Sequence, residues 1–567
     1  MEAETGLERS SGRLYMFVAL ALIAWAAIHV FWILTENVNW DEFALLARAH
    51  DTLRTGTLSS GGRPGLATLL LIPFVEECRD AVRAARFARG LWTVFAVAIL
   101  SGLWGILRCL FHGRPRGAHD AALGVALLAL TPAFLRYSLQ VRTDQPAIAL
   151  GLLGGLALLH SRRHLALAVL AGLLAGTGFL FSQKLIYVAA LVGLLALGDV
   201  LLRRDFEWSR DSIRVALAVL SAAVVVGVYP TVVSQFFEAP PLLPVSGQLD
   251  AFEFYRRTVG YSYYALMSPE LLPQLALVFL LLVSTPRALS HGGPDRGIAM
   301  LAWGVLGLGL AVGMFHAGAF PYFWMTLGLF PAVGIAIGMP VIRGRARQPL
   351  RLTPLELAMW AGLIVTAALA GNSLSRDTQA VQRDTLRLVD ANFGSSSEGF
   401  SSDRALLCRE DEDPFPVYFS QHIFERFSGP DAAEVTTGFL DEFRSRPVTF
   451  MVQSFRLDHF PDVVKDFWAE HYIPYAAALL VPGASLDFSS DLETTIFDVI
   501  VPGEYRLYGV EAGAVVRVDG VPLRDGETVR LDLGPHGVQA GSNVQGLLAL
   551  SLPDPPDLPA RQFFKRF

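Results

Sequence analysis

Two adjacent carboxylates, Asp41 and Glu42, lie just after the first hydrophobic segment of the chain, in the tetrad Asn39-Trp40-Asp41-Glu42. An acidic pair at the exit from a membrane segment suggests chemistry at the membrane surface. The alternative is structural, because Asn39 or Asp41 could cap a helix that begins near residue 42, where the helix dipole favours acidic side chains. The tetrad alone leaves both interpretations open.

Charged residues also fall in two later connections between hydrophobic segments. Arg142 and Asp144 lie in a short loop, and such charges are expensive between membrane spans unless they pair or serve a function. An Arg142–Asp144 structural pair is the alternative. Lys184 is the only one of the chain's three lysines outside the C-terminal region. A lysine suits a phosphate as a compact point charge, although a lysine at a span end can also simply extend to the interface.

Three further residues are candidates for the same site. Arg63 lies in the helix-breaking segment Gly61-Gly62-Arg63-Pro64-Gly65, and His316 and Tyr322 lie in an aromatic segment. A histidine at a membrane interface is more often a bystander than a functional group, so His316 is the weakest of these candidates.

The composition indicates an integral membrane protein, because 53% of the 567 residues are hydrophobic and only 17% are charged. A membrane-spanning helix needs roughly 20 apolar residues, somewhat fewer at short hairpins. We therefore predict about eleven spans, near 14–34, 88–111, 118–135, 145–160, 165–182, 185–202, 213–235, 271–285, 297–315, 320–342 and 354–371. The first is predicted to be an uncleaved anchor.

Basic residues predict the orientation of these spans, since short arginine-rich loops stay in the cytoplasm. Alternate loops are rich in arginine, for example 162–163, 203–214 and 343–351. This pattern predicts a cytoplasmic N-terminus and an extracytoplasmic C-terminal region in a plasma (inner) membrane protein. Asp41, Asp144, Lys184 and His316 would then share the extracytoplasmic face.

Two extracytoplasmic segments are predicted to lie at the membrane surface. Residues 43–53 have an amphipathic helical pattern, and the run 66–75 is too short to span, so it is expected to be re-entrant or interfacial. The loop 236–270 combines aromatic and basic residues and is expected to cover a substrate.

Beyond the membrane domain at 1–371, the composition becomes that of a soluble, acidic region. Residues 372–483 are predicted to form an α/β region, with helices near 376–392 and 460–470 and a strand at 447–453. Residues 484–567 are predicted to form a small β-sandwich, with turns at Pro502-Gly503, Asp519-Gly520, Asp525-Gly526 and Gly534-Pro535.

Composition and cysteine content also limit the partners. The acidic balance gives no support for nucleic-acid binding. The cysteines Cys78, Cys109 and Cys408 are far apart, so no disulfide framework is expected, and no pattern predicts a zinc site. We predict no metal ligands; a divalent cation is possible in principle but unassigned.

The order of these motifs resembles the GT-C glycosyltransferases, specifically the protein O-mannosyltransferase and lipid A aminoarabinose transferase superfamily (glycosyltransferase family 39-like). The resemblance covers about residues 14–371. It rests on Trp40-Asp41-Glu42, the following amphipathic segment, Arg63-Pro64, Arg142-Thr143-Asp144-Gln145-Pro146, Lys184 and the segment from His316 to Tyr322.

The resemblance implies an enzyme that transfers a sugar from a polyprenyl-phosphate donor to a hydroxyl of a protein, lipid or cell-envelope glycan. By resemblance Asp41 is the catalytic residue, accompanied by Glu42. A lipid phosphate is already a stable leaving group, so a single base suffices and no general acid is needed. Lys184, Arg142 and Arg63 would bind the donor phosphate. Asp144, His316 and Tyr322 would orient the acceptor, the sugar or these cations.

Two other function classes remain open. A transporter or lipid flippase would also need many spans, but transporters usually show paired halves and charges near the middle of the bilayer. We find no internal repeat, and the charges gather at one face. An inactive membrane scaffold would make the Asp41 cluster incidental. The C-terminal region departs from the protein O-mannosyltransferases, whose soluble module lies between spans, so the acceptor is not predicted. The sequence does not predict the oligomeric state either.

Overall fold

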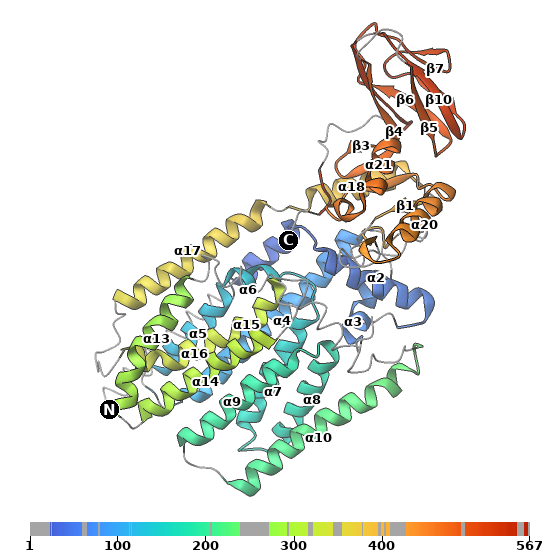
Figure 1. The fold of residues 1–567 in the computed structure, drawn as a ribbon. Coiled ribbons are helices and arrows are strands. Elements are labelled where there is room, and N and C mark those ends of the chain that lie inside the picture. The colour runs from blue at the N-terminus through green and yellow to red at the C-terminus, as the bar shows by residue number, and fades with distance from the viewer. Residues whose placement is uncertain are drawn as a thin grey trace. The chain divides into compact units, whose positions relative to one another are not determined.

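A helical unit and a β-rich unit make up the protein in the computed structural model (Figure 1). The helical unit comprises Met1–Glu36, Arg48–Glu76 and Arg86–Asp377, and the β-rich unit comprises Asn37–Ala47, Glu77–Ala85 and Thr378–Phe567. The structure describes the chain between residues 23 and 564, except for 24, 59–64, 77–79, 113, 115, 204–206, 239–271, 292–293, 316–320, 344–353, 377, 395–397, 402–403, 409–426, 489–493, 542 and 553–560.

Helices occur wherever the sequence predicts a span. The first is the apolar helix Trp25–Thr35. The others are α4 (Ala81–Leu110), α5 (Gly117–Ala129), α6 (Pro132–Tyr137), α7 (Asp144–His160), α8 (Ala166–Phe181), α9 (Leu185–Arg203), α10 (Trp208–Val233), α13 (Leu272–His291), α14 (Pro294–Phe315), η2 (Pro321–Phe323), α15 (Trp324–Leu327), α16 (Leu329–Arg343) and α17 (Pro354–Arg376).

Four of the helices among the described residues are long and apolar enough to cross a membrane. They cover Ala81–Leu110, Ser209–Val233, Arg296–Met314 and Trp324–Arg343, and shorter apolar helices accompany them. The chain is a membrane protein, and the count of eleven spans remains a prediction.

The two segments that the sequence places at the membrane surface are both helical. The amphipathic segment forms α2 (Trp40–Thr55), and the short apolar run forms α3 (Leu66–Val75). Most of the loop 236–270 lies outside the described residues.

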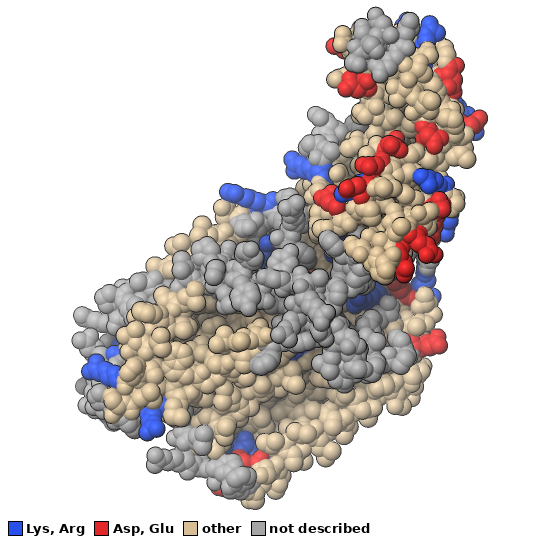
Figure 2. All heavy atoms as spheres, viewed as in Figure 1, with Lys and Arg blue, Asp and Glu red and all other residues tan. Residues whose placement is uncertain are grey.

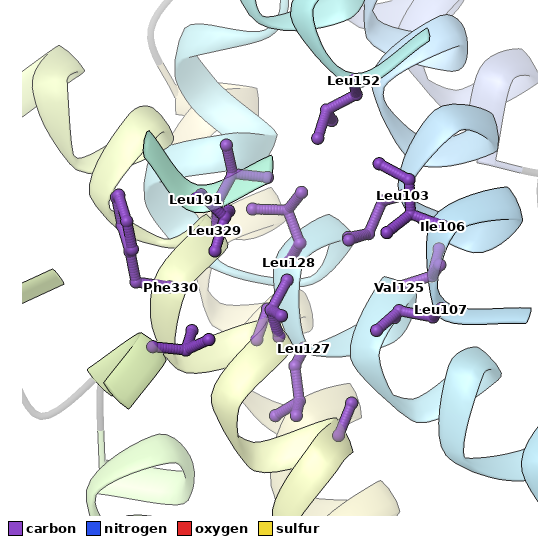
Figure 3. Close-up of a cluster of buried hydrophobic side chains, with 14 of the residues drawn as sticks. Leu103, Ile106, Leu107, Val125, Leu127, Leu128, Leu152, Leu191, Leu329 and Phe330 are labelled. Carbon is purple, nitrogen blue, oxygen red and sulfur yellow. The ribbon is translucent and has the colours of Figure 1, made fainter. Parts of the chain in front are cut away.

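The core of the helical unit is a cluster of aliphatic side chains from several helices (Figure 3). Leu103 of α4, Val125 of α5 and Leu329 of α16 are all buried there. Glycines allow the backbones to approach closely at other helix contacts. A Cβ on Gly172 of α8 would clash with the carbonyl oxygen of Ala218 in α10. Small residues of this kind drive close helix packing in membrane proteins.

The β-rich unit begins with helices and ends with strands. Its helices are α18 (Ala380–Asn392), α20 (Ala432–Ser445), η3 (Leu457–His459) and α21 (Asp462–His471). Its strands are β1 (Gly399–Phe400), β2 (Phe450–Val452), β3 (Tyr472–Ala476), β4 (Leu479–Phe488), β5 (Thr494–Val499), β6 (Gly503–Tyr508), β7 (Val516–Val518), β8 (Val521–Leu523), β9 (Thr528–Leu531), β10 (Gly534–Gln539) and β11 (Val544–Leu550). The predicted strand at 447–453 and the helices near 376–392 and 460–470 correspond to β2, α18 and α21.

The strands form two sheets. One has the order β1-β2-β4-β11-β6-β9, with β3 also pairing with β4, and the other has the order β5-β10-β7-β8. Both sheets bury alternate side chains in one core that includes Phe488, Phe497, Tyr505 and Val518, as expected for a sandwich. The expected boundary at 483/484 falls inside β4, which pairs with β2 and β3 through its first half and with β11 through its second.

The cysteine prediction is wrong in one respect. Cys408 forms a disulfide bond, whereas Cys109 is a free thiol. The chain's remaining cysteine is Cys78, which lies outside the described residues. Sequence separation suggested no pairing, but separation along the chain places no limit on the distance in a folded protein.

The two units differ in surface chemistry. On the face shown in Figure 2, Asp and Glu side chains are scattered over the β-rich unit, and large areas of the helical unit carry neither acidic nor basic side chains. The helical unit also exposes many large apolar side chains, including Val219 and Leu220 of α10, Phe279 of α13 and Met314 of α14. Such a surface is costly in water and suits contact with lipid.

Candidate functional site

The Asp41 segment is the capped N-terminus of α2. Asn39 precedes the helix, and its Oδ1 accepts a hydrogen bond from the Asp41 backbone N–H at 3.0 Å. The Glu42 Oε2 accepts a hydrogen bond from the Asn39 N–H at 2.8 Å, so the two side chains form a reciprocal capping box. The helix begins at Trp40, slightly earlier than predicted, and Asn39 is the capping residue.

The cap separates the roles of the two adjacent carboxylates. Glu42 is fully buried, and its carboxylate completes the cap. Asp41 is half-buried, and its backbone rather than its carboxylate takes part in the cap. The structural interpretation therefore accounts for the side chains of Asn39 and Glu42.

Arg142 lies in the loop between α6 and α7 and is held from two sides. Its Nε donates a hydrogen bond to Gln140 Oε1 at 2.8 Å, and its carbonyl oxygen accepts one from Trp92 Nε1 at 2.7 Å. Gln145, which is fully buried, donates through Nε2 to the carbonyl oxygens of Tyr137 and Gln140. The loop is thus fixed by side-chain hydrogen bonds from α4 and α7.

Lys184 lies in the short connection between α8 and α9 and forms an ion pair with Asp144 at the start of α7. The Lys184 Nζ lies 2.8 Å from Asp144 Oδ2, and Ser182 Oγ donates to Asp144 Oδ1 at 2.8 Å. Asp144 is buried, and a quarter of the Lys184 side chain, 25%, is exposed. Asp144 is therefore the ion-pair partner of Lys184, whereas the structural alternative expected from the sequence was a pair between Asp144 and Arg142.

Tyr322 brings the two cations together. The Arg142 Cζ lies 4.0 Å from the centroid of the Tyr322 ring, and the Lys184 Nζ lies 4.8 Å from the same centroid. Tyr137 meets the Tyr322 ring edge-on, with centroids 6.4 Å apart. Cation–π contacts of this kind are attractive by about 0.5–2 kcal/mol. The structure thus brings Arg142, Asp144, Lys184 and Tyr322 together, and their roles toward a donor and an acceptor stay predictions.

A further ion-pair group in the same unit involves Glu36, Arg89 and Arg136. Arg89 is fully buried, and its Nη1 donates to the Glu36 carbonyl oxygen at 2.9 Å. The Glu36 carboxylate lies 3.6 Å from Arg89 Nη2 and 3.9 Å from Arg136 Nε. Arg136 lies in α6, directly before the loop that carries Arg142.

Two cations of the cluster, Arg142 and Lys184, contact the ring of Tyr322, and a quarter of the Lys184 side chain is exposed. Charge-assisted hydrogen bonds from such groups bind phosphate strongly, with arginine suited to two oxygens and lysine to one.

The other predicted site residues lie outside the described residues or in the other unit. Arg63 and His316 lie outside the described residues. Asp41 and Glu42 belong to the β-rich unit, whereas Arg142, Asp144, Lys184 and Tyr322 belong to the helical unit.

Several supporting residues were missed by the sequence reasoning. Gln140, Ser182 and Trp92 orient Arg142, Asp144 and the loop backbone. Gln140 and Ser182 are each two positions from a predicted site residue, so a search for polar neighbours in the same loop could have found them. Trp92 lies on a different helix, and nothing local in the sequence points to its contact.

Comparisons with known proteins give structural neighbours only. No protein-family model matches the chain, and no curated protein sequence matches it. The crystal structure of ArnT from Cupriavidus metallidurans bound to undecaprenyl phosphate is similar with 16% identity and a TM-score of 0.41, over 77% of this chain and 72% of that one. The apo form of that protein has 14% identity and a TM-score of 0.49, over 83% of this chain and 98% of that one.

A third neighbour is the oligosaccharyltransferase of Archaeoglobus fulgidus in its apo form. It has 10% identity and a TM-score of 0.40, over 96% of this chain and 99% of that one. These neighbours are GT-C superfamily glycosyltransferases, the superfamily that the sequence motifs resemble. At these identities and TM-scores, the likeness does not carry an activity, a donor or an acceptor over to this chain.

Proposed function

We propose that this protein is a membrane glycosyltransferase that transfers a sugar from a polyprenyl-phosphate donor to a hydroxyl of an extracytoplasmic acceptor. The observation that carries the proposal is the Lys184–Asp144 ion pair, which lies with Arg142 against the ring of Tyr322. A buried carboxylate that holds a partly exposed lysine next to an arginine is an arrangement suited to a lipid phosphate.

The proposed reaction is a single displacement with inversion. The acceptor hydroxyl attacks the anomeric carbon and gives its proton to the carboxylate of Asp41. The bond between the anomeric carbon and the phosphate oxygen breaks, and its electron pair leaves with the polyprenyl phosphate. Negative charge therefore grows on the phosphate, where Lys184 and Arg142 stabilise it.

The remaining residues support these two groups. Glu42 fixes the cap of the helix that carries Asp41, and Asp144 fixes Lys184. Tyr322 orients the two cations and, in this proposal, the sugar. Arg63 and His316 are kept as proposed phosphate-binding and acceptor-orienting residues. No metal ion is assigned.

The proposed location is the plasma (inner) membrane, with the N-terminus cytoplasmic and the C-terminal region extracytoplasmic. The disulfide at Cys408 supports this orientation, because disulfides persist in oxidising compartments and are rare in the reducing cytosol.

The test is transfer by the purified protein in lipid nanodiscs, supplied with a panel of polyprenyl-phosphate sugars and assayed for released lipid phosphate. We expect one donor to give release that depends on an acceptor. Asp41→Asn is nearly isosteric and should lower kcat by at least about 100-fold, the lower range for loss of a general base, without loss of membrane insertion.

Asp51→Asn is the matched control, because it makes the same chemical change further along α2. It should keep near-normal transfer. Transfer by Asp41→Asn at the rate of the Asp51→Asn variant would rule out Asp41 as the base. Movement of a lipid across the bilayer without release of lipid phosphate would favour a flippase instead.

A further inference from the structure

The N-terminal part of α2, which carries Asp41, is built into the β-rich unit. Residues Asn37–Ala47 group with Thr378–Phe567, although the rest of α2 groups with the helical unit. Three separate parts of the C-terminal region contact this short segment, and each contacts a different residue within three positions of Asp41.

The first contact is a pair of hydrogen bonds between Val38 and Gln382 of α18. The Val38 N–H donates to Gln382 Oε1 at 2.9 Å, and Gln382 Nε2 donates to the Val38 carbonyl oxygen at 2.8 Å. Both residues are fully buried. The amide of Gln382 therefore pairs with the backbone just before the helix cap, as a neighbouring strand would.

The second contact is the stacking of Arg456 on Trp40. The Arg456 Cζ lies 3.9 Å from the centroid of the Trp40 ring, and only 2% of Arg456 is exposed. Arg456 directly precedes η3, and its backbone N–H donates to Ser454 Oγ at 3.2 Å. A buried guanidinium on an indole is a strong and directional contact, and Trp40 is adjacent to Asp41 in the sequence.

The third contact comes from the tail segment 561–564. The ring centroids of Phe563 and Phe564 lie 6.0 Å and 5.7 Å from that of Phe43. The backbone of the tail is anchored as well, because the Phe563 N–H donates to the Gln453 carbonyl oxygen at 2.8 Å. Phe43 faces these rings and is fully buried.

We propose that the C-terminal region acts as the positioning device for Asp41, with Gln382, Arg456 and the pair Phe563 and Phe564 as positioning residues. This inference rests on the proposed function of Asp41 as the base. Val38, Trp40 and Phe43 bracket Asp41, and each is fixed by a different part of the C-terminal region. The carboxylate direction is therefore set by residues that lie far away in the sequence.

The test combines kinetics with hydrogen exchange on the full-length protein in nanodiscs. Arg456→Ala should lower kcat about 10- to 100-fold, since small misplacements of a catalytic group cost up to this factor, and should leave the KM for the donor unchanged. Arg456→Lys keeps a cation over Trp40 and should recover most of kcat. Backbone exchange in the segment 38–47 should accelerate in Arg456→Ala but not in Arg456→Lys.

Gln382→Glu is a second, nearly isosteric variant that still accepts from the Val38 N–H but cannot donate to its carbonyl oxygen. It should also lower kcat and accelerate exchange in 38–47. Arg444→Ala is the matched control, because Arg444 is an exposed arginine of the same unit, and it should change neither quantity.

The outcomes separate this inference from the proposed function. If Asp41→Asn is inactive but Arg456→Ala and Gln382→Glu keep normal kcat and normal exchange in 38–47, the positioning role is wrong and the base assignment stands. If Asp41→Asn is fully active, the base assignment is wrong. The exchange data would then still report whether the C-terminal region holds this segment, but the positioning of a catalytic group would be overturned.

Discussion

Two roles of Lys184, the proposed binding of the donor phosphate and the ion pair with Asp144, can be distinguished by mutation. Lys184→Met removes the ammonium and should raise the KM for the donor by about 10- to 100-fold, as expected for loss of about 1.5–3 kcal/mol of charge-assisted hydrogen bonding. It also leaves Asp144 buried without this partner, which should lower the thermal stability. Steady-state kinetics with donor and acceptor varied in turn, and thermal unfolding, measure the two effects.

The double variant Lys184→Met with Asp144→Asn distinguishes these effects. Replacing both charges removes the uncompensated carboxylate, so stability should recover while the donor KM stays high. Lys465→Met is the matched control, because Lys465 pairs with Asp462 at an exposed site of the β-rich unit. A change in the acceptor KM alone would contradict the phosphate role of Lys184.

At the scale of elements, the structure shows which parts of the site could be predicted from local sequence. The cap at Asn39 and Glu42 spans three residues, so its spacing is visible in the sequence. Apolar runs likewise predict where helices lie in the membrane part, but not the breaks within the runs 118–135 and 320–342, which the structure divides into α5 and α6, and η2, α15 and α16. The turn at Asp519-Gly520 is also local, and both residues have positive φ, as a type I′ hairpin requires.

Contacts between elements could not be predicted in the same way. Lys184 and Asp144 are 40 residues apart, and only the packing of α7, α8 and α9 shows that they pair. The contact between Arg456 and Trp40 gives no sequence signal either, since Trp40 belongs to the acidic tetrad but nothing in the sequence around Arg456 connects it to that motif. The sequence could identify the charged residues of the cluster, but not their partners, because pairing is a property of tertiary packing.

The hairpin of β7 and β8 should give a pH-dependent stability. Asp519 accepts a hydrogen bond from His536 Nδ1, which raises the pKa of His536 above its usual 6.5 and lowers that of Asp519 below its usual 3.8. The stabilisation from His536 is complete below pH 6.5 and is lost as pH rises through its raised pKa. The stabilisation from Asp519 is complete above pH 3.8 and is lost as pH falls through its lowered pKa.

Asp519→Asn tests this expectation, because asparagine tolerates the positive φ of this position but removes the charge. The variant should destabilise the hairpin by less than about 1 kcal/mol, since the pair is partly exposed. The difference from the unmodified protein should be largest between about pH 4 and 6.5 and should vanish at alkaline pH. Hydrogen exchange in β7 and β10 measures it locally. A pH-independent difference would contradict the ion pair.

At the scale of the whole molecule, the oxidation state of Cys408 reports the compartment in which the β-rich unit lies. If this unit is extracytoplasmic, Cys408 should be oxidised in protein made in membranes. Thiol labelling of denatured protein, read by peptide mass spectrometry, should modify Cys109 without reductant and Cys408 only after reduction. Cys109, a free thiol of the membrane part, serves as the internal standard for labelling.

Protein retained in a reducing cytosol should lack this pattern, because its thiols are kept reduced. Cys408→Ser removes the bond, so no label should depend on reductant in this variant. If the bond stabilises the fold, the variant should unfold at a lower temperature than the unmodified protein, and reductant should not lower that temperature further. Labelling of Cys408 in unreduced protein from native membranes would place the β-rich unit in a reducing compartment. Asp41 would then lie on the cytoplasmic side, where a polyprenyl-phosphate sugar presented at the outer face could not reach it. The proposed reaction at the extracytoplasmic face would be ruled out.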